Sequence, residues 1–366
     1  MKIMNLEGVD LEIAGLQSEQ EGDGLLGKQN VVGMGVGRKL TERTGQVSGE
    51  PCLTVLVSHK MDLDDLSEHD RIPARLAGFP TDVLTVGQLF AGGAAAVATP
   101  LPRRKNGKAS GSGPQRYEAF SPPFVPADAP SESFGTEPAL EVDIQPLRGR
   151  VRPAQGGYSV AHPRVTAGTI ATGVVDRGAL PGIPSKYYLL SNNHVLANSN
   201  AASLGDPILQ PGPADGGTFP ADVIGRLARF VPIRFGGPDN FVDAAIAEVP
   251  FHQLSREIFG IGHPAKQIAG VAVNQIVQKT GRTTNYTQGR VQVLNATVNV
   301  NYGGGRVARF VRQIVTTAMS AGGDSGSLVL DLDDRPIGLL FAGSSVATIL
   351  NPIVAVQSLL GIRIGF

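Results

Sequence analysis

Three residues of the carboxy-terminal half carry side chains that together could cleave an acyl bond. Ser325 lies in the glycine-rich run GGDSGS, Asp243 in NFVDAAIAEV and His194 in LLSNNHVLA. Acyl transfer from an amide needs a hydroxyl nucleophile, an imidazole that accepts and returns its proton, and a carboxylate that fixes the imidazole tautomer. The sequence therefore predicts that His194, Asp243 and Ser325 act together as a catalytic group.

The glycines around Ser325 indicate how a developing oxyanion would be stabilised. Gly323 has little steric restriction, so the backbone can turn until the amides of Gly323 and Ser325 point at one spot. We expect an oxyanion hole made of these two amides. Asp324, which lies between them, is expected to bond the backbone of the turn.

Other polar residues are weaker candidates. Asp239 is an alternative to Asp243, but it lies in the turn GGPDN, whereas Asp243 directly precedes the apolar run AAIAEV. The histidines outside LLSNNHVLA lack a mutual spacing suited to a metal site, so neither a metal nor another cofactor is expected. Cys52 lies in an apolar run without a partner base nearby and is expected to be a core residue.

The order His194, Asp243, Ser325, with a strand ending near the histidine and a GDSGS loop, resembles the trypsin-like (chymotrypsin-fold) serine peptidases over about residues 150 to 366. The runs SNNHVLA and KTGRTTNYTQGRV resemble the intracellular bacterial branch related to the plant narrow-leaf type trypsin-like proteases. This resemblance implies a mainly β, two-barrel antiparallel fold. It also implies a serine endopeptidase that works through an acyl-enzyme on a protein or peptide substrate, in a possible homo-oligomer.

The resemblance also implies where the substrate side chain before the cleaved bond would lie. Its pocket would be lined by Met319, six positions before the nucleophile, and by Phe341, Ala342 and Gly343 in the strand that follows. No carboxylate stands at the Met319 position, so a basic side chain would be left without a counter-ion. We therefore expect cleavage after apolar residues.

Two departures from the digestive enzymes of this family stand out. The disulfide that usually flanks the histidine is absent, since Asn192 and Val195 stand near His194 in place of the expected residues. No convincing activation site would deliver a new amino terminus to Asp324. The nearest candidate is Arg164, followed by VTAG, which is also explained as the residue before the first strand. Activation by assembly, ligand or another route stays open.

The chain is expected to have four parts. Residues 1–24 form a flexible arm or a short docking helix, residues 25–98 a small α+β domain, residues 99–148 a Pro/Ser/Gly-rich linker, and residues 149–366 the peptidase domain. In the second part, VVGMGVGRKL and PCLTVLVSHK predict a hairpin, DLDDLSEHDRIPARLAG a helix and TDVLTVGQLF a strand. In the last part, short β-type runs are followed by a terminal helix in IVAVQSLLGIRI.

Composition narrows the function classes. The 366 residues include 32 Lys plus Arg and 32 Asp plus Glu, and this zero net charge disfavours nucleic acid and anionic membranes as partners. No apolar run is long enough to span a bilayer, and acids at Glu7, Asp10 and Glu12 argue against a signal peptide. With one cysteine, no intrachain disulfide can form. The expected location is the cytoplasm.

Two further motifs leave alternatives open. The glycines of VVGMGVG resemble the start of a dinucleotide-binding loop, but RKLTERTGQ follows in place of a helix, so a nucleotide-binding protein is a distant third possibility. Arg306, Arg309 and Arg312 form either a patch for an acidic partner or a solvated strand edge. The second possibility for the whole chain is a catalytically silent trypsin-like scaffold that binds partners.

Overall fold

A computed structural model describes residues 4, 6–16, 20–40, 47–92, 147–178, 184–268 and 270–365. The described residues of 4–92 and 147–365 belong to one compact unit. The predicted linker, residues 99–148, lies outside the described residues except for its last two.

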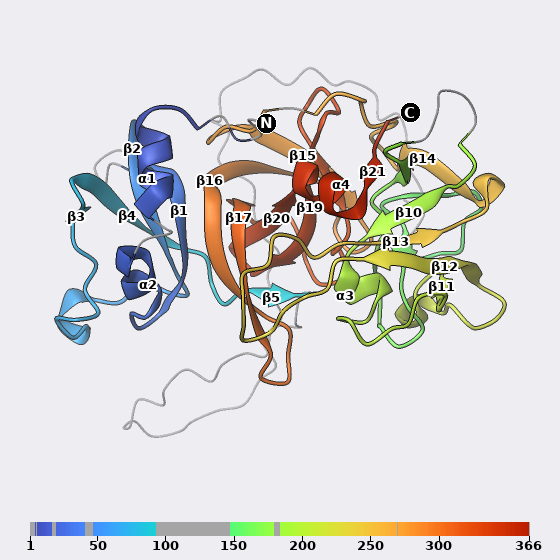
Figure 1. The fold of residues 1–366 in the computed structure, drawn as a ribbon, viewed down its shortest axis with the longest axis horizontal. Helices are drawn as coiled ribbons and strands as arrows, with labels where there is room; N and C mark the ends of the chain where they lie inside the picture. The colour runs from blue at the N-terminus through green and yellow to red at the C-terminus, as the bar shows by residue number, and fades with distance from the viewer. Residues whose placement is uncertain are drawn as a thin grey trace, which may run out of the picture. The chain divides into compact units, whose positions relative to one another are not determined.

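The carboxy-terminal region contains a closed barrel of antiparallel strands. These strands are β15 (Ile276–Gly281), β16 (Asn285–Asn301), β17 (Val307–Thr317), β18 (Leu328–Leu330), β19 (Pro336–Gly343) and β20 (Ala347–Pro352). Their hydrogen-bonded order is β15, β18, β19, β20, β17, β16, and β15 also pairs with β16, which closes the ring. The terminal helix is confirmed as α4 (Ile353–Leu360), directly after β20 (Figure 1).

All strands of a second antiparallel sheet except the last, β21 (Ile362–Arg363), precede this barrel in the chain. In hydrogen-bonded order its strands are β11 (Pro207–Leu209), β12 (Val223–Phe230), β13 (Ala245–Glu248), β10 (Tyr188–Ser191), β9 (Gly173–Asp176) and β21. Short pairs flank it: β6 (Ala154–Gly156) with β14 (Leu254–Ile258), and β7 (Ser159–Val160) with β8 (Gly168–Thr169). The helical turns here are α3 (Asn193–Leu196), η2 (Pro213–Asp215) and η3 (Phe251–Gln253). The predicted mainly β fold class is confirmed.

The amino-terminal strands extend the barrel sheet. The predicted hairpin is present as β1 (Val31–Leu40) and β2 (Val47–Val57), followed by β3 (Arg75–Leu76) and β4 (Phe79–Thr85). β1 pairs antiparallel with the second half of β16, whose first half pairs with β15. Because β16 is long enough to serve both neighbours, the segment predicted as a small α+β domain shares one sheet with the segment predicted as the peptidase domain (Figure 1).

The glycines of VVGMGVG have a packing role in this sheet. A Cβ at Gly33 would lie 2.5 Å from the Thr297 carbonyl oxygen, and one at Gly35 would lie 2.3 Å from Cγ1 of Val293. Only glycine allows β1 to approach β16 this closely. The motif continues as a strand and opens no helix, so the dinucleotide-loop interpretation is wrong.

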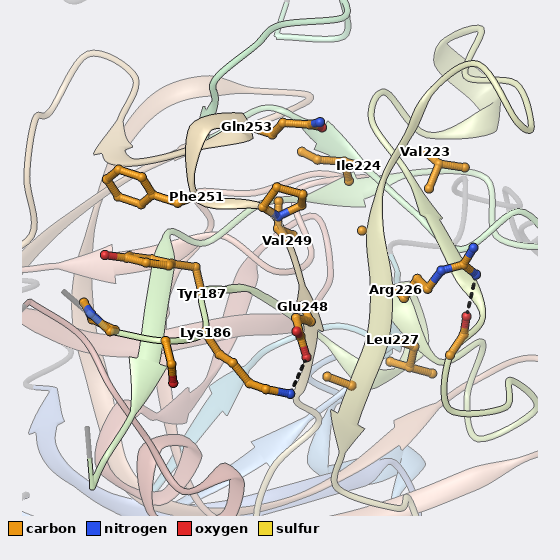
Figure 2. A pocket seen from close by; sticks show the side chains of 16 residues that line it. Lys186, Tyr187, Val223, Ile224, Arg226, Leu227, Glu248, Val249, Phe251 and Gln253 are labelled. Atoms are coloured by element: carbon orange, nitrogen blue, oxygen red, sulfur yellow. Dashed lines mark hydrogen bonds and ion pairs between the residues drawn. The ribbon is translucent and has the colours of Figure 1, made fainter. Parts of the chain in front are cut away.

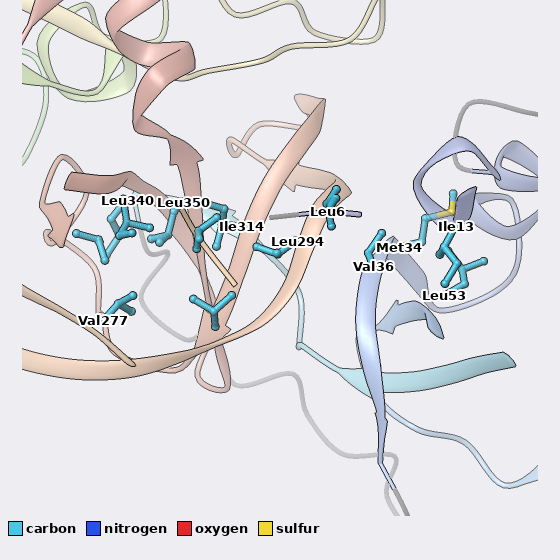
Figure 3. Packing of buried hydrophobic residues seen from close by; sticks show 14 of the residues in the cluster. Leu6, Ile13, Met34, Val36, Leu53, Val277, Leu294, Ile314, Leu340 and Leu350 are labelled. Atoms are coloured by element: carbon cyan, nitrogen blue, oxygen red, sulfur yellow. The ribbon is translucent and has the colours of Figure 1, made fainter. Parts of the chain in front are cut away.

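The first described residues are docked on this sheet. α1 (Val9–Leu16) buries Ile13 completely, and its Asp10 pairs with Arg38 of β1 at 2.7 Å. α2 (Gln20–Leu26) follows. One hydrophobic cluster continues from α1 and the hairpin into the barrel, as Figure 3 shows for Met34, Leu294 and their neighbours. Of the two possibilities for this segment, the docking helix is the one present.

The helix predicted over DLDDLSEHDRIPARLAG is wrong. The structure has a single 3-10 turn, η1 (Leu63–Asp65), then turns and β3. Pro73 removes a backbone donor and disfavours a helical residue before it. Asp70 accepts hydrogen bonds from the Gln29 amide at 2.9 Å and the Ser67 hydroxyl at 2.7 Å, so side chains here bond the turn and a neighbouring segment.

Candidate active site

The fold brings His194 and Asp243 into direct contact. His194 lies in α3, which begins just after β10 ends, and Asp243 lies just before β13, the strand paired with β10. Asp243 Oδ2 is 2.6 Å from His194 Nδ1, and its Oδ1 accepts the His194 amide at 3.1 Å. The carboxylate thus fixes both the backbone and the ring of the histidine, as the sequence predicts for a base and its orienting acid.

Asp243 is fully buried and held from several sides. Asn351 Oδ1 accepts the Asp243 amide at 2.9 Å, and Asn192 Nδ2 donates to the Asp243 carbonyl at 2.7 Å. The Tyr302 hydroxyl donates to Asp243 Oδ2 at 2.8 Å. Tyr302 comes from the hairpin between β16 and β17, so no sequence spacing pointed to it. Burial first, and then the negative charge of Asp243, hold the pKa of Tyr302 well above its usual value.

Ser325 is placed less tightly. It lies in the turn that leads from β17 to β18 and is 3% exposed. Its Oγ donates to the Phe341 carbonyl at 3.5 Å, a long and weak bond. His194 Nε2 is buried without a hydrogen-bond partner among the described residues. Serine and histidine bonds of this kind often tighten only when substrate is bound.

The oxyanion hole predicted around Ser325 depends on the backbone conformation at Gly323. Gly323 has φ +99°, a conformation that favours glycine, and a Cβ there would lie 2.5 Å from Thr283 Oγ1. Neither the Gly323 amide nor the Ser325 amide donates a hydrogen bond within the part of the chain that the structure describes. Both donors are therefore available to an incoming carbonyl oxygen.

Lys279 holds this turn from inside the barrel. Its Nζ is 3.2 Å from Asp324 Oδ2, and both side chains are completely buried. Asp324 also accepts the amides of Thr283 at 2.8 Å and Ala321 at 2.9 Å, which is the structural role expected of it. Burial lowers the pKa of Lys279, and the nearby Asp324 charge opposes that effect. Lys279 lies within the run KTGRTT, but no sequence spacing pointed to its contact with Asp324.

This ion pair bears on activation. Asp324 receives its cation from Lys279 of the same chain and needs no new amino terminus to neutralise it. Arg164, the candidate cleavage position, lies in an exposed turn shortly before β8. Because β6 and β7 precede it, Arg164 is a turn residue between β7 and β8 and not the residue before the first strand.

The residues expected to line the substrate pocket are placed differently from one another. Met319 is 4% exposed and belongs to the hydrophobic cluster of the barrel interior. Phe341 is fully buried, with its ring 4.7 Å from that of Phe310. Ala342 and Gly343 lie in β19 and pair with β5 (Phe90–Ala91). Met319 and Phe341 are thus enclosed in the interior, the edge of Ala342 and Gly343 is covered by β5, and the pocket assignment stays a prediction.

Asp239, the alternative acid, forms an ion pair with Arg309 of the arginine motif. Asp239 Oδ1 is 2.5 Å from Arg309 Nε, and Asp23 is 3.2 Å from the same guanidinium. Asp239 is therefore engaged away from His194. Arg306 and Arg312 each lie over an aromatic ring, at 5.1 and 5.5 Å from the ring centre. These contacts are those of a structured strand edge.

The remaining candidate residues have bonding roles. His162 Nε2 is 3.2 Å from Asp206 Oδ2, and His263 Nε2 is 3.3 Å from Glu257. Cys52 is fully buried, and burial raises the pKa of its thiol, as expected of an unreactive core residue. Within the described ranges no cluster of His, Cys, Asp or Glu is suited to hold a metal ion.

The large surface hollow lies away from the candidate site. About 790 Å³ in volume, it is lined by Lys186, Tyr187, Glu248 and Phe251, among others (Figure 2). None of His194, Asp243 and Ser325 lines it. Among the helices of the described residues, none has the length and apolar character needed to cross a bilayer.

Two curated proteins resemble part of the chain. Glutamyl endopeptidase 2 of Streptomyces griseus is 36% identical over 102 residues, which cover 26% of this chain and 50% of that protein. Serine protease 1 of Streptomyces fradiae is 50% identical over 58 residues, 16% of this chain and 15% of that protein. The matched parts of the chain are thus similar to bacterial serine proteases. The chain spans half the length of the first of these relatives and much less of the second.

Solved structures and family models add the following. Thermobifida fusca protease A matches at a TM-score of 0.41 and 17% identity, over 57% of this chain and 97% of its own. A glutamic acid specific serine protease, described as using a histidine triad in substrate binding, matches at a TM-score of 0.41 and 22% identity, over 58% of this chain and 100% of its own. No family model matches. The predicted relation to the plant branch stays a prediction.

Proposed function

We propose that this trypsin-like chain is a serine endopeptidase in which Ser325, His194 and Asp243 form an acyl-enzyme. The observation that carries the proposal is the 2.6 Å contact between Asp243 Oδ2 and His194 Nδ1, made by a carboxylate that is fully buried. This contact leaves Nε2 as the ring atom that can act as base. It supports a catalytic pair because the carboxylate that holds His194 is fully buried, whereas those beside His162 and His263 are partly exposed.

The proposed reaction uses groups already placed in the site. His194 Nε2 accepts the Ser325 hydroxyl proton while Oγ attacks the peptide carbonyl carbon, and it returns the proton to the leaving amine. Asp243 keeps the proton of Nδ1 in place throughout. The amides of Gly323 and Ser325 donate to the oxyanion, an interaction worth about 3 to 4 kcal/mol per donor in comparable sites.

The substrate is proposed to be a protein or peptide with an apolar side chain before the cleaved bond. Ala342 and Gly343 have little side-chain bulk, and the carbonyl of Phe341, the residue before them, lies 3.5 Å from Ser325 Oγ. One relative is, by its name, a glutamyl endopeptidase. Hydroxyl groups of Ser320 and Thr348 lie 2.8 Å apart next to Met319 and would be the available partners for a carboxylate. Matched peptides that differ only in Ala, Leu, Glu or Arg at this position discriminate these preferences.

The decisive test compares the wild type with Ser325→Ala. A fluorophosphonate probe should label the wild type and leave the variant unlabelled, because the variant lacks the hydroxyl that attacks phosphorus. Loss of Ser325 should remove peptidase turnover by about 10⁶-fold, as for a comparable triad serine. Ser327→Ala is the matched control, since its hydroxyl bonds the Asp324 carbonyl at 2.7 Å and faces the turn. Labelling of Ser325→Ala would overturn the assignment.

The second candidate is a catalytically silent scaffold. It is favoured by the unpartnered His194 Nε2 and by the long bond from Ser325 Oγ to Phe341. A silent scaffold would neither react with the probe nor cleave any peptide of the set. The cytoplasmic location and the homo-oligomer are further proposals, to be tested by cell fractionation and by light scattering.

A further inference from the structure

The chain lays one of its own strands along the edge of β19 beside Ser325. Ala91 of β5 pairs antiparallel with Ala342, and Phe90 pairs with Gly343. On its other side, Phe90 pairs parallel with Asn301 of β16. Ala342 and Gly343 are the strand residues implied as substrate contacts, so β5 occupies the edge at which an extended peptide would bind.

Gly92, the next residue, lies against the candidate base. A Cβ placed on Gly92 would be 3.6 Å from both Nε2 and Cδ2 of His194, which is van der Waals contact. Its φ of +74° turns the chain in a way that favours glycine. Figure 1 shows β5 ending close to α3, the element that carries His194.

The segment before Gly92 is held firmly. Leu89 is 2% exposed and belongs to the same hydrophobic cluster as Phe341. The Leu89 carbonyl accepts the Asn301 amide at 2.9 Å, and the Val86 carbonyl accepts a hydrogen bond from Ser344 Oγ. These contacts fix the register of the strand, with Ala91 opposite Ala342 and Gly92 next to His194.

We propose that residues 89–92 are a substrate of this site and that Ser325 cleaves the bond between Ala91 and Gly92 of its own chain. The proposal rests on the proposed function and names the substrate class: an extended segment with a small apolar residue before the bond and glycine after it. The geometry supports this register because the leaving nitrogen must lie near the base, and Gly92 is the residue on which an added Cβ would lie 3.6 Å from His194 Nε2.

The chemistry balances with water as the only co-reactant. Ser325 Oγ bonds to the Ala91 carbonyl carbon, and the C–N bond to Gly92 breaks as His194 Nε2 transfers the serine proton to that nitrogen. Water then attacks the ester, giving up a proton through His194, and releases the Ala91 carboxylate and the free Ser325 hydroxyl. The Ala91 carbonyl must first move into the oxyanion hole, since the amides of Gly323 and Ser325 are still unengaged.

Cleavage would not by itself separate the two fragments. β1 stays paired with β16 through main-chain hydrogen bonds, and the hydrophobic cluster that includes Met34 and Leu294 spans the two fragments. The cut chain should therefore elute as one species in native buffer and appear as residues 1–91 and 92–366 only when denatured.

The test is intact mass measurement of denatured protein during incubation at neutral pH. Wild type should convert to fragments 1–91 and 92–366 with a first-order rate that does not change with protein concentration. Ser325→Ala should stay whole. Ala91→Arg should slow the cut at least tenfold, because a long charged side chain replaces a methyl group at the cleavage position. Gln88→Ala, at an exposed residue outside the paired strand, is the matched control and should cut like the wild type.

Each result decides the proposal. A wild type that hydrolyses added peptides and reacts with the probe, yet stays whole or is cut elsewhere, overturns self-cleavage and leaves the proposed function standing. A cut that persists in Ser325→Ala assigns the cleavage to a contaminant and overturns the proposal. Absence of probe labelling, of peptide hydrolysis and of the cut together defeats both. Circular dichroism checks that Ala91→Arg folds. If Ala91→Arg does not fold, Ala91→Leu, with a bulkier apolar side chain, takes its place and should be cut at a measurable rate.

Discussion

Asp243 and Ser325 are the two partners of His194 in the proposed triad, and the surrounding residues hold them to different degrees. The Asp243 carboxylate bonds the His194 ring at 2.6 Å, the His194 amide at 3.1 Å and the Tyr302 hydroxyl at 2.8 Å. The Ser325 hydroxyl has one bond of 3.5 Å, to the Phe341 carbonyl, and His194 Nε2 has none within the described residues. The carboxylate end is pre-organised, whereas the serine end is left to be completed by a peptide.

The difference follows from what each group must do. Asp243 keeps its charge through the reaction, so fixed donors stabilise every state equally and position the ring. Ser325 changes its bonds at each step, and a strong resting hydrogen bond would have to be broken first. At Asp243 the side chain itself is held rigidly. At Ser325 the side chain is not, but the turn that carries it is held by the ion pair of Lys279 and Asp324.

Among changes outside Ser325 itself, the largest effect should come from the Asp243 carboxylate. Asp243→Asn keeps the shape but favours the wrong imidazole tautomer, and turnover should fall by about 10⁴-fold, the loss known for the equivalent change in trypsin. Steady-state hydrolysis of the best matched peptide measures it. Asp239→Asn is the control, because that carboxylate pairs with Arg309 and should leave turnover within about twofold. If Asp239→Asn were the crippled variant, Asp239 and not Asp243 would be the carboxylate that orients His194.

The next effect tests what keeps the serine turn rigid. Lys279→Met leaves the Asp324 charge buried without its cation, which should cost about 3 to 5 kcal/mol of unfolding free energy. Urea unfolding measures this, and probe labelling of Ser325 should slow in parallel. Lys266→Met, at an exposed lysine, is the control. The double variant Lys279→Met with Asp324→Leu should recover part of the loss, and equal losses in both variants would refute the ion-pair explanation.

A smaller effect should come from Tyr302, a positioning residue that acts through Asp243. Tyr302→Phe removes one donor from a charged acceptor, a contribution of about 1.5 to 3 kcal/mol, so kcat/KM should fall about ten- to a hundredfold. The freed charge on Asp243 should stabilise the protonated ring, and the midpoint of the rise of kcat/KM with pH should move upward. Tyr286→Phe, whose hydroxyl bonds Gln278 at 2.9 Å, is the control. An unmoved midpoint would reduce Tyr302 to a packing residue.

The smallest effect concerns stability in alkali. The pKa of Tyr302 is raised in the folded state, so above pH 10 the unfolded chain releases this proton and the folded chain retains it. The stability that this raised pKa contributes is complete below pH 10 and is lost as the pH rises toward the pKa of Tyr302 in the folded state. Wild type should therefore lose up to about 1.4 kcal/mol per pH unit more than Tyr302→Phe between pH 10 and 11 in urea unfolding. Parallel curves would show that the hydroxyl is solvated. Tyr158 and Tyr188, whose pKa values burial also raises, set the slope that remains in the variant.

The sequence predicted the strand-rich fold from local pattern, because alternating apolar runs and turn residues are short-range signals. The hairpin of β1 and β2, the terminal helix and the contact of His194 with Asp243 all followed from such signals or from the family resemblance. The helix predicted around Ser67 and Asp70 failed for the opposite reason: side-chain bonds to the Gln29 segment outweighed a local charge pattern.

By itself the sequence determined the chemistry that is possible, since Ser325, His194 and Asp243 carry their functional groups in any fold. Only the tertiary structure decided which other residues meet them. Tyr302 reaches Asp243 from the turn between the long strands β16 and β17, and Lys279 reaches Asp324 through the closure of the barrel. β5 lies along β19 for the same physical reason: contacts between residues far apart in the chain depend on sheet pairing and burial, which no local spacing encodes.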